Sequence, residues 1–260
     1  MRIVIKVGTS TLAYESGHLN IRHTEELCKV LSDLKNAGHE LILVSSGAIG
    51  MGVGKLSLKE RPTDIPTKQA AAAVGQCELM YTYDRLFSLY HHNVAQLLLT
   101  GSDFTSEERH LNFRNTVLRL LELDAIPVVN ENDTVATDEI KVGDNDTLSA
   151  LVAVSTEADL LILLSDIDGL YTADPHKNEN ARLISRVDAI TPDILALGGE
   201  SGTSLGTGGM ATKLSAARLC VENGCDMIIT NGSHPEYLYD IMDGKSVGTR
   251  FVAHFKKGEE

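Results

Sequence analysis

The chain has 260 residues, 43% of them hydrophobic and 23% charged, which is enough to bury the core of one large α/β domain or of two small ones. Its formal net charge of −13 argues against non-specific binding to nucleic acid or to an acidic membrane surface. Apolar runs stay short of the roughly eighteen residues that span a bilayer, and Met1 leads into a strand-like segment without a signal peptide, so we expect a cytoplasmic protein.

The cysteines and histidines predict neither disulfides nor a transition-metal site. The four cysteines form no C-x-x-C pair and fall in helical or strand-like segments, so we expect buried thiols in a reducing compartment. They are Cys28, Cys77, Cys220 and Cys225. Among the nine histidines, only His91 and His92 are adjacent, and none are spaced as His-x-x-x-His.

The first buried strand is predicted at residues 2–7, and it carries a lysine near its end. A lysine inside a buried strand is costly unless its ammonium reaches water or an anion. Lys6 therefore either extends to an edge of the sheet or awaits a ligand. The small residues 8–10 follow at once and would let a phosphate approach, so they favour the ligand.

Helices and strands then alternate along the chain. Asn20 is the expected N-cap of a helix that runs to Ala37, and Gly38 would end it. Further strands are expected at residues 39–44, 93–99 and 126–129, a small-residue turn at 45–55, an exposed excursion at 58–66, and helices at 67–91 and around 113–121. This order favours an α/β fold in which a mostly parallel sheet has helices on both faces and binds ligands beyond the carboxyl ends of its strands.

Residues 130–150 concentrate acidic and amide side chains between two segments that look like core. A solvated turn would explain this cluster, because Asn and Asp favour turns. A pocket at the carboxyl end of the strand 126–129 is the functional alternative. Residues 135–142 alternate like a hairpin, and a helix is expected at 144–155. Its cap and first turn would hold Asp144, Asn145 and Asp146, of which only one can be the cap.

The second half begins with a buried strand at residues 158–164, which leads into Ser165 and Asp166. Six glycines in residues 198–209 precede a helix with Lys213 in its first turn. The macrodipole disfavours a cation there by about 0.3–1 kcal/mol, so a phosphate held by glycine N–H groups, the dipole and Lys213 is the better explanation. A flexible linker is the alternative. A strand at 227–230, a helix at 235–242 and an edge strand at 249–255 complete the fold.

Six motifs, all in order, make the chain resemble the amino acid kinase family over essentially its whole length. They are KVGTS at 6–10, SSGA at 45–48, NEND at 130–133, KVGDND at 141–146, GLY at 169–171 and GTGGMATK at 206–213. The first and fifth occur in looser form across the family. The KVGDND segment with NEND ahead of it is much more specific, and it is similar to members that phosphorylate glutamate.

The resemblance implies one domain, residues 1–260, folded as an αβα sandwich, with glutamate bound by about residues 1–157 and ATP by about 158–260. It implies that Lys6 and Lys213 flank the transferring phosphoryl group and that Asp146 orients both lysines. The implied glutamate-binding residues are Ser46, Asn130, Asp133 and Asn145. The implied nucleotide-binding residues are Lys6, Gly8, Ser165, Asp166, Thr207, Gly208, Gly209, Met210, Ala211, Thr212 and Lys213. Magnesium is expected on the ATP phosphates rather than in a site of its own.

The resemblance also implies a homodimer or homotetramer, and feedback inhibition by proline at the glutamate pocket. Many members of this group carry a further carboxyl-terminal PUA domain, and the sequence ends at Glu260 without one. Two alternatives stay open. One is another acid or phosphate-ester kinase of the family, which would differ around Asp133 and Asn145. The other is a nucleotide-binding regulatory protein without catalysis, for which both lysines would be an unnecessary cost.

Overall fold

The computed structural model describes residues 1–14, 16, 18–136, 144–175, 177–199 and 209–254. Within these residues, eight strands form one sheet in the order β3-β4-β2-β1-β5-β7-β8-β6. The strands are β1 (Arg2–Val7), β2 (Glu40–Ser45), β3 (Val94–Leu99), β4 (Ile126–Glu131), β5 (Leu160–Ser165), β6 (Arg186–Val187), β7 (Asp226–Asn231) and β8 (Thr249–Phe251). Neighbouring strands run parallel except β7 and β8. The mostly parallel sheet expected from the sequence is confirmed.

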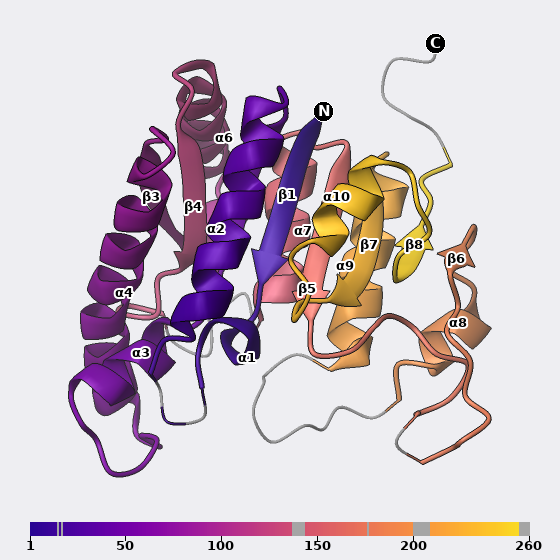
Figure 1. Ribbon diagram of the computed structural model, residues 1–260, viewed down its shortest axis with the longest axis horizontal. Helices are drawn as coiled ribbons and strands as arrows, with labels where there is room; N and C mark the ends of the chain where they lie inside the picture. The colour runs from indigo at the N-terminus through magenta and orange to yellow at the C-terminus, as the bar shows by residue number, and fades with distance from the viewer. Residues whose placement is uncertain (15, 17, 137–143, 176, 200–208, 255–260) are drawn as a thin grey trace.

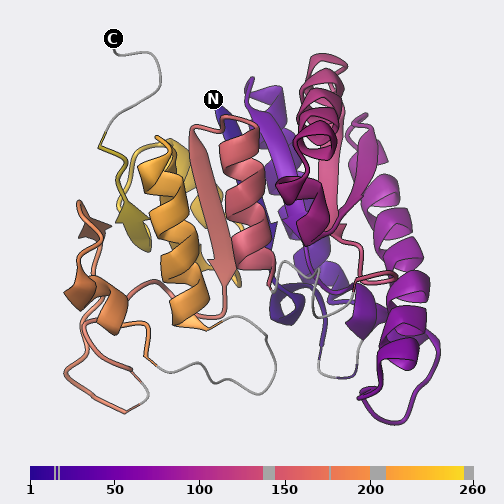
Figure 2. The same ribbon diagram turned by 180° about the vertical axis from the view of Figure 1, so that it is seen from behind.

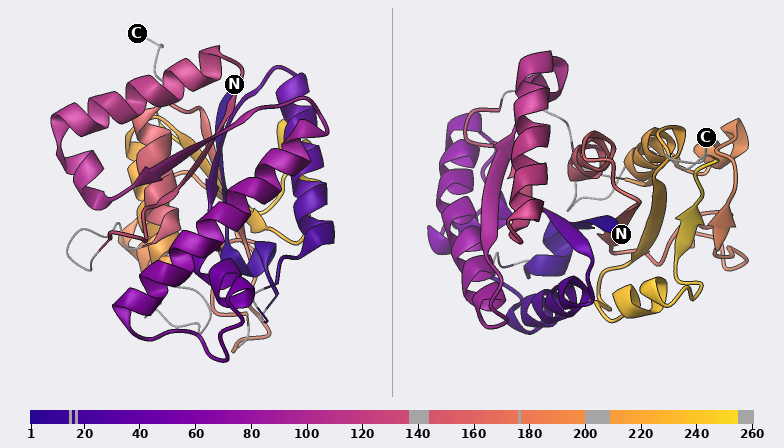
Figure 3. Two further views of the ribbon diagram at one scale, coloured as in Figure 1. Left: turned by 90° about the vertical axis from the view of Figure 1, so that its left-hand side faces the viewer. Right: turned by 90° about the horizontal axis from the view of Figure 1, so that it is seen from above.

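Helices cover both faces of the sheet, as Figures 1 and 2 show from opposite sides and Figure 3 from above. The helices are α1 (Thr9–Leu12), α2 (Ile21–Asn36), α3 (Ala48–Lys55), α4 (Ile65–Ser88), α5 (Gly101–Thr105), α6 (Glu107–Glu122), α7 (Asn145–Ser155), α8 (Pro192–Ala196), α9 (Met210–Glu222) and α10 (Tyr237–Met242). α2 and α10 lie in front of the sheet in Figure 1, and α6, α7 and α9 lie behind it. The fold is an αβα sandwich.

The core consists of two apolar layers, one on each face of the sheet. Successive side chains of a strand point to opposite faces. In β1, Ile3 and Ile5 pack with α2, α4 and α10, whereas Val4 belongs to the layer that contacts α6, α7 and α9. Because the central strands are buried on both faces, they read as continuous apolar runs in the sequence.

Side-chain caps fix where three of the long helices begin. The Asn20 side chain accepts a hydrogen bond from the backbone N–H of His23, which caps α2 as predicted. Asp64 caps α4 in the same way, and Asp144 caps α7. α4 therefore begins two residues before the predicted start, because Pro66 is well tolerated in the first turn of a helix.

Some expectations from the sequence were wrong. β4 extends two residues beyond Val129, so that Asn130 and Glu131 lie inside the strand and are buried. β8 is not an edge strand, because β6 pairs with its outer side. Both β6 and β8 are too short for a pattern of alternation to reveal their place in the sheet. The predicted hairpin at 135–142 lies outside the described residues from 137 onward.

The thiols are free, and one of them is exposed. Cys28, Cys220 and Cys225 are buried as expected, but Cys77 is exposed on α4. Burial raises the pKa of the Cys28 thiol well above its usual range, so this side chain is inert. Among the helices in the described part of the chain, none is both long and apolar enough to cross a membrane.

Candidate active site

The candidate site lies where the central parallel strands end together. β1 lies between β2 and β5, with Lys6 opposite Val44 on one side and Leu163 on the other. Because β1 is central, Lys6 cannot extend to an edge of the sheet, and that alternative is wrong. The carboxyl ends of β1, β2, β4 and β5 bring residues 8, 46, 131 and 165 to one side of the molecule.

Two lysines contact one buried carboxylate. The Nζ atom of Lys6 lies 2.7 Å from Oδ1 of Asp146, and the Nζ atom of Lys213 lies 3.0 Å from Oδ2. The Asp146 side chain is only 1% exposed. Burial opposes ionisation of this carboxyl, but the charges of Lys6 and Lys213 and their hydrogen bonds outweigh burial and lower its pKa. Asp146 is therefore ionised at neutral pH and holds together two cations from β1 and α9.

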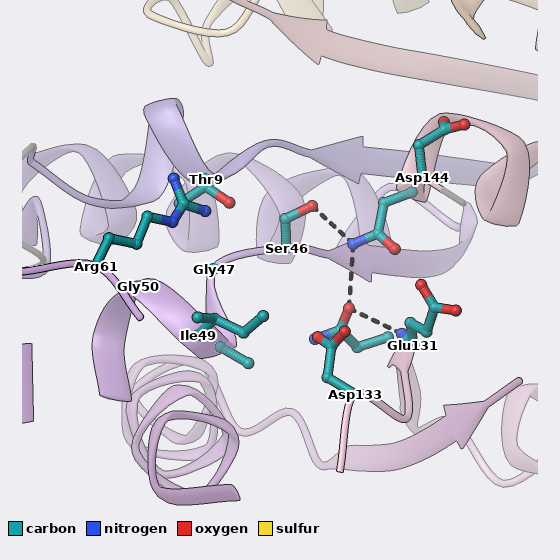
Figure 4. Close-up of a pocket in the computed structure, with 12 residues that line it drawn as sticks. Thr9, Ser46, Gly47, Ile49, Gly50, Arg61, Glu131, Asp133 and Asp144 are labelled. Atoms are coloured by element: carbon teal, nitrogen blue, oxygen red, sulfur yellow. Dashed lines mark hydrogen bonds between the residues drawn. The ribbon is translucent and has the colours of Figure 1, made fainter. Parts of the chain in front are cut away.

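Helix α7 presents two neighbouring residues to two different parts of the site. Asp146, in its first turn, contacts the lysines, whereas Asn145 contacts polar groups at the ends of β2 and β4. The Nδ2 atom of Asn145 lies 2.7 Å from Oγ of Ser46 and 3.1 Å from Oδ1 of Asn130, which are hydrogen bonds drawn in Figure 4. Asp144 provides the cap of the helix by accepting from the backbone N–H of Thr147. The first turn of α7 thus contacts both the lysines, through Asp146, and the polar side chains of Ser46 and Asn130, through Asn145.

A pocket of about 130 Å³ opens beside Asn145. Its lining residues are Thr9, Ser46, Gly47, Ala48, Ile49, Gly50, Arg61, Asn130, Glu131, Asp133, Asp144 and Asn145. The four residues predicted to hold the substrate all belong to this one pocket, although they come from four places: the loop after β2, strand β4, the turn that follows β4, and helix α7. Figure 4 shows Arg61 at the opposite end of the pocket from Glu131 and Asp144.

The start of α3 forms one wall of this pocket. Gly47 adopts a left-handed conformation with φ of 105°, which a residue with a side chain would rarely adopt. Its turn lets α3 begin at Ala48, shortly after β2 ends at Ser45. No side chain caps α3, so the backbone N–H groups of its first turn lie at the pocket with their partial positive charge.

Of the residues predicted to bind the nucleotide, Gly8 and those in the first turn of α9 lie close to the two lysines. A side chain at Gly8 would place its Cβ 3.7 Å from the ammonium of Lys6. The Oγ1 atom of Thr212 lies 3.1 Å from Oδ2 of Asp146 and 2.8 Å from the carbonyl oxygen of Gly209, the N-cap of α9. Met210 and Ala211 follow in the first turn of α9. Thr207 and Gly208 lie outside the described residues.

Two further predicted nucleotide-binding residues lie at the same edge of the sheet as the pocket, but on the other side of β1. Ser165 ends β5, which neighbours β1, and its Oγ atom donates to Oδ1 of Asp166 at 3.1 Å. Ser165 is buried and Asp166 is exposed. The structure therefore brings the two groups of predicted residues to neighbouring strand ends, with Asp146 between them.

Comparison with known proteins identifies the family. The model of the amino acid kinase family matches residues 1–231. The chain belongs to the amino acid kinase family.

Relatives within the amino acid kinase family match nearly the whole chain. A protein of Clostridium tetani named glutamate 5-kinase is 56% identical over 96% of this chain and 94% of its own length. A glutamate 5-kinase of Listeria innocua is 54% identical over 97% of this chain and 93% of its own length. One from Caldanaerobacter subterraneus is 50% identical over 97% of this chain and 68% of its own, longer, chain.

Two solved kinase structures share the fold at low sequence identity. A UMP kinase from Bacillus anthracis superposes with a TM-score of 0.67 at 15% identity, over 98% of this chain and 96% of that one. A carbamate kinase from Giardia lamblia, bound to AMP-PNP, superposes with a TM-score of 0.68 at 16% identity, over 96% of this chain and 98% of that one. At these identities the likeness concerns the fold alone.

Two residues of this amino acid kinase site were missed in the sequence. Arg61 lines the pocket, but the charge and prolines of residues 58–66 suggested only an exposed excursion, and Arg61 is indeed exposed. Gln76 contacts Asn130 from the interior of α4. A single glutamine within an alanine-rich helix gives no signal of such a contact, because its partner is remote in sequence.

Proposed function

We propose that this chain transfers the γ-phosphoryl group of ATP to the side-chain carboxylate of L-glutamate, which forms L-glutamyl 5-phosphate in the first step of proline biosynthesis. The relatives named glutamate 5-kinase support this proposal, since they match nearly the full length of the chain. The observation that carries it is the first turn of α7, where Asn145 belongs to a polar pocket and its neighbour Asp146 holds two lysines.

The chemistry of carboxylate phosphorylation suits this arrangement. A carboxylate is ionised near neutral pH and needs no general base to attack phosphorus. The difficulty is the repulsion between two anions. Lys6 and Lys213, directed by Asp146, would offset that repulsion on both sides of the transferring group, and in-line positioning would supply much of the remaining rate acceleration.

The charges of the pocket suit an amino acid with two carboxylates. In our proposal, the ammonium group of glutamate lies toward Asp133, Ser46 donates a hydrogen bond to one of its carboxylates, and Asn145 lines the pocket and orients Ser46. The α-carboxylate would meet the N–H groups at the start of α3, with Arg61 as the basic residue that lines the pocket. The side-chain carboxylate would then extend toward Lys6.

The nucleotide would lie on the other side of Asp146. Gly8, Ser165, Asp166 and the segment from Thr207 to Lys213 would surround its phosphates, so that residues 1–157 bind glutamate and residues 158–260 bind ATP. The described residues contain no group of three or more His, Cys, Asp or Glu side chains that could hold a metal ion. We therefore expect magnesium to arrive on the ATP phosphates as part of the substrate.

Assembly, location and regulation belong to the same proposal. By its likeness to the family we expect a cytoplasmic homodimer or homotetramer, which sedimentation would distinguish. Proline would compete with glutamate for the pocket. Added proline should then slow the reaction at low glutamate and have little effect at saturating glutamate, and an unchanged rate at low glutamate would contradict this part.

One assay decides the substrate. ADP release should be measured with glutamate, aspartate, N-acetylglutamate and a nucleoside monophosphate side by side, and the product of the glutamate reaction trapped with hydroxylamine as the hydroxamate. We expect ADP release only with glutamate. Release with another acceptor would identify a different kinase of the family, and ATP binding without ADP release from any acceptor would identify a regulatory protein.

A further inference from the structure

Gln76 is a buried amide below the pocket that the chemistry above does not use. It lies on α4, it is 7% exposed, and it is not among the residues that line the pocket. Its Oε1 atom accepts a hydrogen bond from Nδ2 of Asn130 at 3.0 Å. Its Nε2 atom has no hydrogen-bond partner among the described residues.

Packing alone does not explain a glutamine at this buried position, because an unpaired amide N–H group lowers the stability of the fold. A buried N–H group without a partner loses its hydrogen bonds to water and gains none in return. The neighbouring buried positions of α4 are apolar, with Ala72 and Leu79 on the same face. An apolar residue at position 76 would avoid this loss, so the contact with Asn130 is the feature that the amide provides.

That contact is one of three that fix which way the amide of Asn130 faces. Its Oδ1 atom accepts from the backbone N–H of Glu131 at 2.9 Å and from Nδ2 of Asn145 at 3.1 Å. If the Asn130 amide were flipped, its NH₂ group would face these two donors and its oxygen would face Gln76. The acceptor oxygen of Gln76 therefore acts together with these two donors, by accepting from the NH₂ group on the other side, to hold the oxygen of Asn130 toward the pocket.

The orientation of the Asn130 amide in turn fixes the hydrogen bonds of Asn145 and Ser46, which line the pocket. With Asn130 Oδ1 as one acceptor, Nδ2 of Asn145 directs its other proton to Oγ of Ser46 at 2.7 Å. Ser46 is thereby an acceptor toward Asn145, and its own hydroxyl proton is left to donate to an anion in the pocket. A chain of hydrogen bonds runs from the interior of α4 to the pocket wall.

We infer that Gln76 is a positioning residue for the binding of glutamate. This inference rests on the function proposed above. Its acceptor oxygen supports the orientation of Asn130 and Asn145, and through them the donor direction of the Ser46 hydroxyl, without contacting the substrate. Because the Ser46 hydroxyl would bind glutamate equally in the ground state and in the transition state, loss of the alignment should raise KM for glutamate and leave kcat nearly unchanged.

The first test is Gln76→Met, which keeps the length of the side chain and removes its acceptor. We expect KM for glutamate to rise about 10- to 100-fold, with kcat and KM for ATP within about threefold of wild type. The matched control is Thr82→Val, another buried polar residue of α4, whose hydroxyl bonds only to the Glu78 carbonyl of its own helix. It should leave all three constants unchanged.

The second test is Gln76→Glu, which restores the acceptor. Burial should keep the new carboxyl neutral, so that one of its oxygens still accepts from Asn130. Since Nε2 has no partner, its replacement breaks no hydrogen bond, and we expect KM for glutamate within about threefold of wild type. Unchanged KM in folded Gln76→Met would overturn the inference, and so would an equal rise in both variants. If Gln76→Met does not fold, Gln76→Glu decides alone: a KM near wild type supports the inference, and a rise above about tenfold overturns it. Absence of glutamate-dependent ADP release in wild type would instead refute the proposed function.

Discussion

At the scale of single residues, Lys213 is the sharpest test of the proposed chemistry. Lys213→Ala removes one of the two ammonium groups at Asp146 and leaves the contact with Lys6, so the fold should persist. Because loss of one electrostatic clamp at a reaction centre typically costs about 10²–10³ in rate, we expect kcat to fall by that factor. The measurement is ADP release at saturating substrates, together with circular dichroism of the variant.

The control for this prediction is Lys245→Ala. The Lys245 side chain is 61% exposed and contacts Asp240 and Asp243 on the surface, and it is not among the residues that line the pocket. Its removal should change neither kcat nor the melting temperature measurably. Near-normal turnover in Lys213→Ala would remove that lysine from the mechanism.

Asp146 should make stability depend on pH in a defined way. Its pKa is lowered in the folded protein, so its ionised form stabilises the fold. This contribution is complete above the ordinary Asp pKa of about 3.9 and is lost as the pH falls through the lowered value. We expect Asp146→Asn to reduce the free energy of unfolding by about 3 kcal/mol at pH 7, because it leaves two buried cations without their carboxylate.

The comparison across pH is the deciding measurement. In urea titrations, the difference between wild type and Asp146→Asn should begin to shrink below about pH 4, where the carboxyl of the unfolded chain takes up its proton, and should vanish only below the lowered pKa of the folded protein. Exposed Glu179→Gln serves as the control and should differ little from wild type at either pH. A difference that is the same at pH 7 and pH 3 would contradict the assigned ionisation.

Among the residues of the site, sequence patterns alone identified candidates but not their partners. Lys6 and Lys213 could be singled out because each is costly where it stands, in a buried strand and in the first turn of a helix. The carboxylate that they share lies in a third element, and spacing along the chain cannot reveal it. The resemblance to the family supplied that link. Arg61 and Gln76 escaped both routes.

At the scale of elements, the contact between α3 and α4 connects the fold to the pocket. A Cβ at Gly75 would lie 1.7 Å from the carbonyl oxygen of Ala48, and a Cβ at Gly52 would lie 1.8 Å from that of Ala71. The two helices therefore touch backbone to backbone, and only glycine fits at these positions. Since α3 begins at the pocket wall, its position depends on this contact.

Gly75→Ala should both destabilise the protein and impair glutamate binding. We expect the free energy of unfolding to fall by about 3 kcal/mol, because the helices must separate to admit the methyl group. The start of α3 would move with them, so KM for glutamate should rise while KM for ATP stays constant. Thermal unfolding and steady-state kinetics measure the two effects. Ala73→Ser, exposed on the same helix, is the control, and an equally stable Gly75→Ala would refute the close packing.

The long helices and central strands could be predicted from the sequence, whereas the end of β4 could not. The cap Asn20 has a local cause, a side chain that accepts from the backbone three residues on, so local sequence was enough there. At residues 144–146 local sequence left three candidates, of which Asp144 is the cap. The end of β4 depends on distant partners. Asn130 is polar yet buried because Gln76 and Asn145 satisfy its amide, and a hydrophobicity pattern ends the strand too early.

At the scale of the whole molecule, magnesium should matter for turnover and not for folding. The described residues offer no cluster of metal ligands, and the ion is expected to bind with ATP. Excess EDTA should therefore abolish ADP release, and added magnesium should restore it. The melting temperature without nucleotide should be the same with and without EDTA. A lower melting temperature in EDTA would indicate a metal ion bound by the protein itself.

The position of Asp146 between Lys6 and Lys213 also has a consequence for the order of folding. These two lysines come from near opposite ends of the chain, so their convergence closes most of the chain into one loop and requires β1 to lie in place between β2 and β5. Contacts of such long sequence separation carry a high entropic cost and form late. Helices capped by local residues can regain their structure first, and the capacity for phosphoryl transfer should return only in the last phase of refolding.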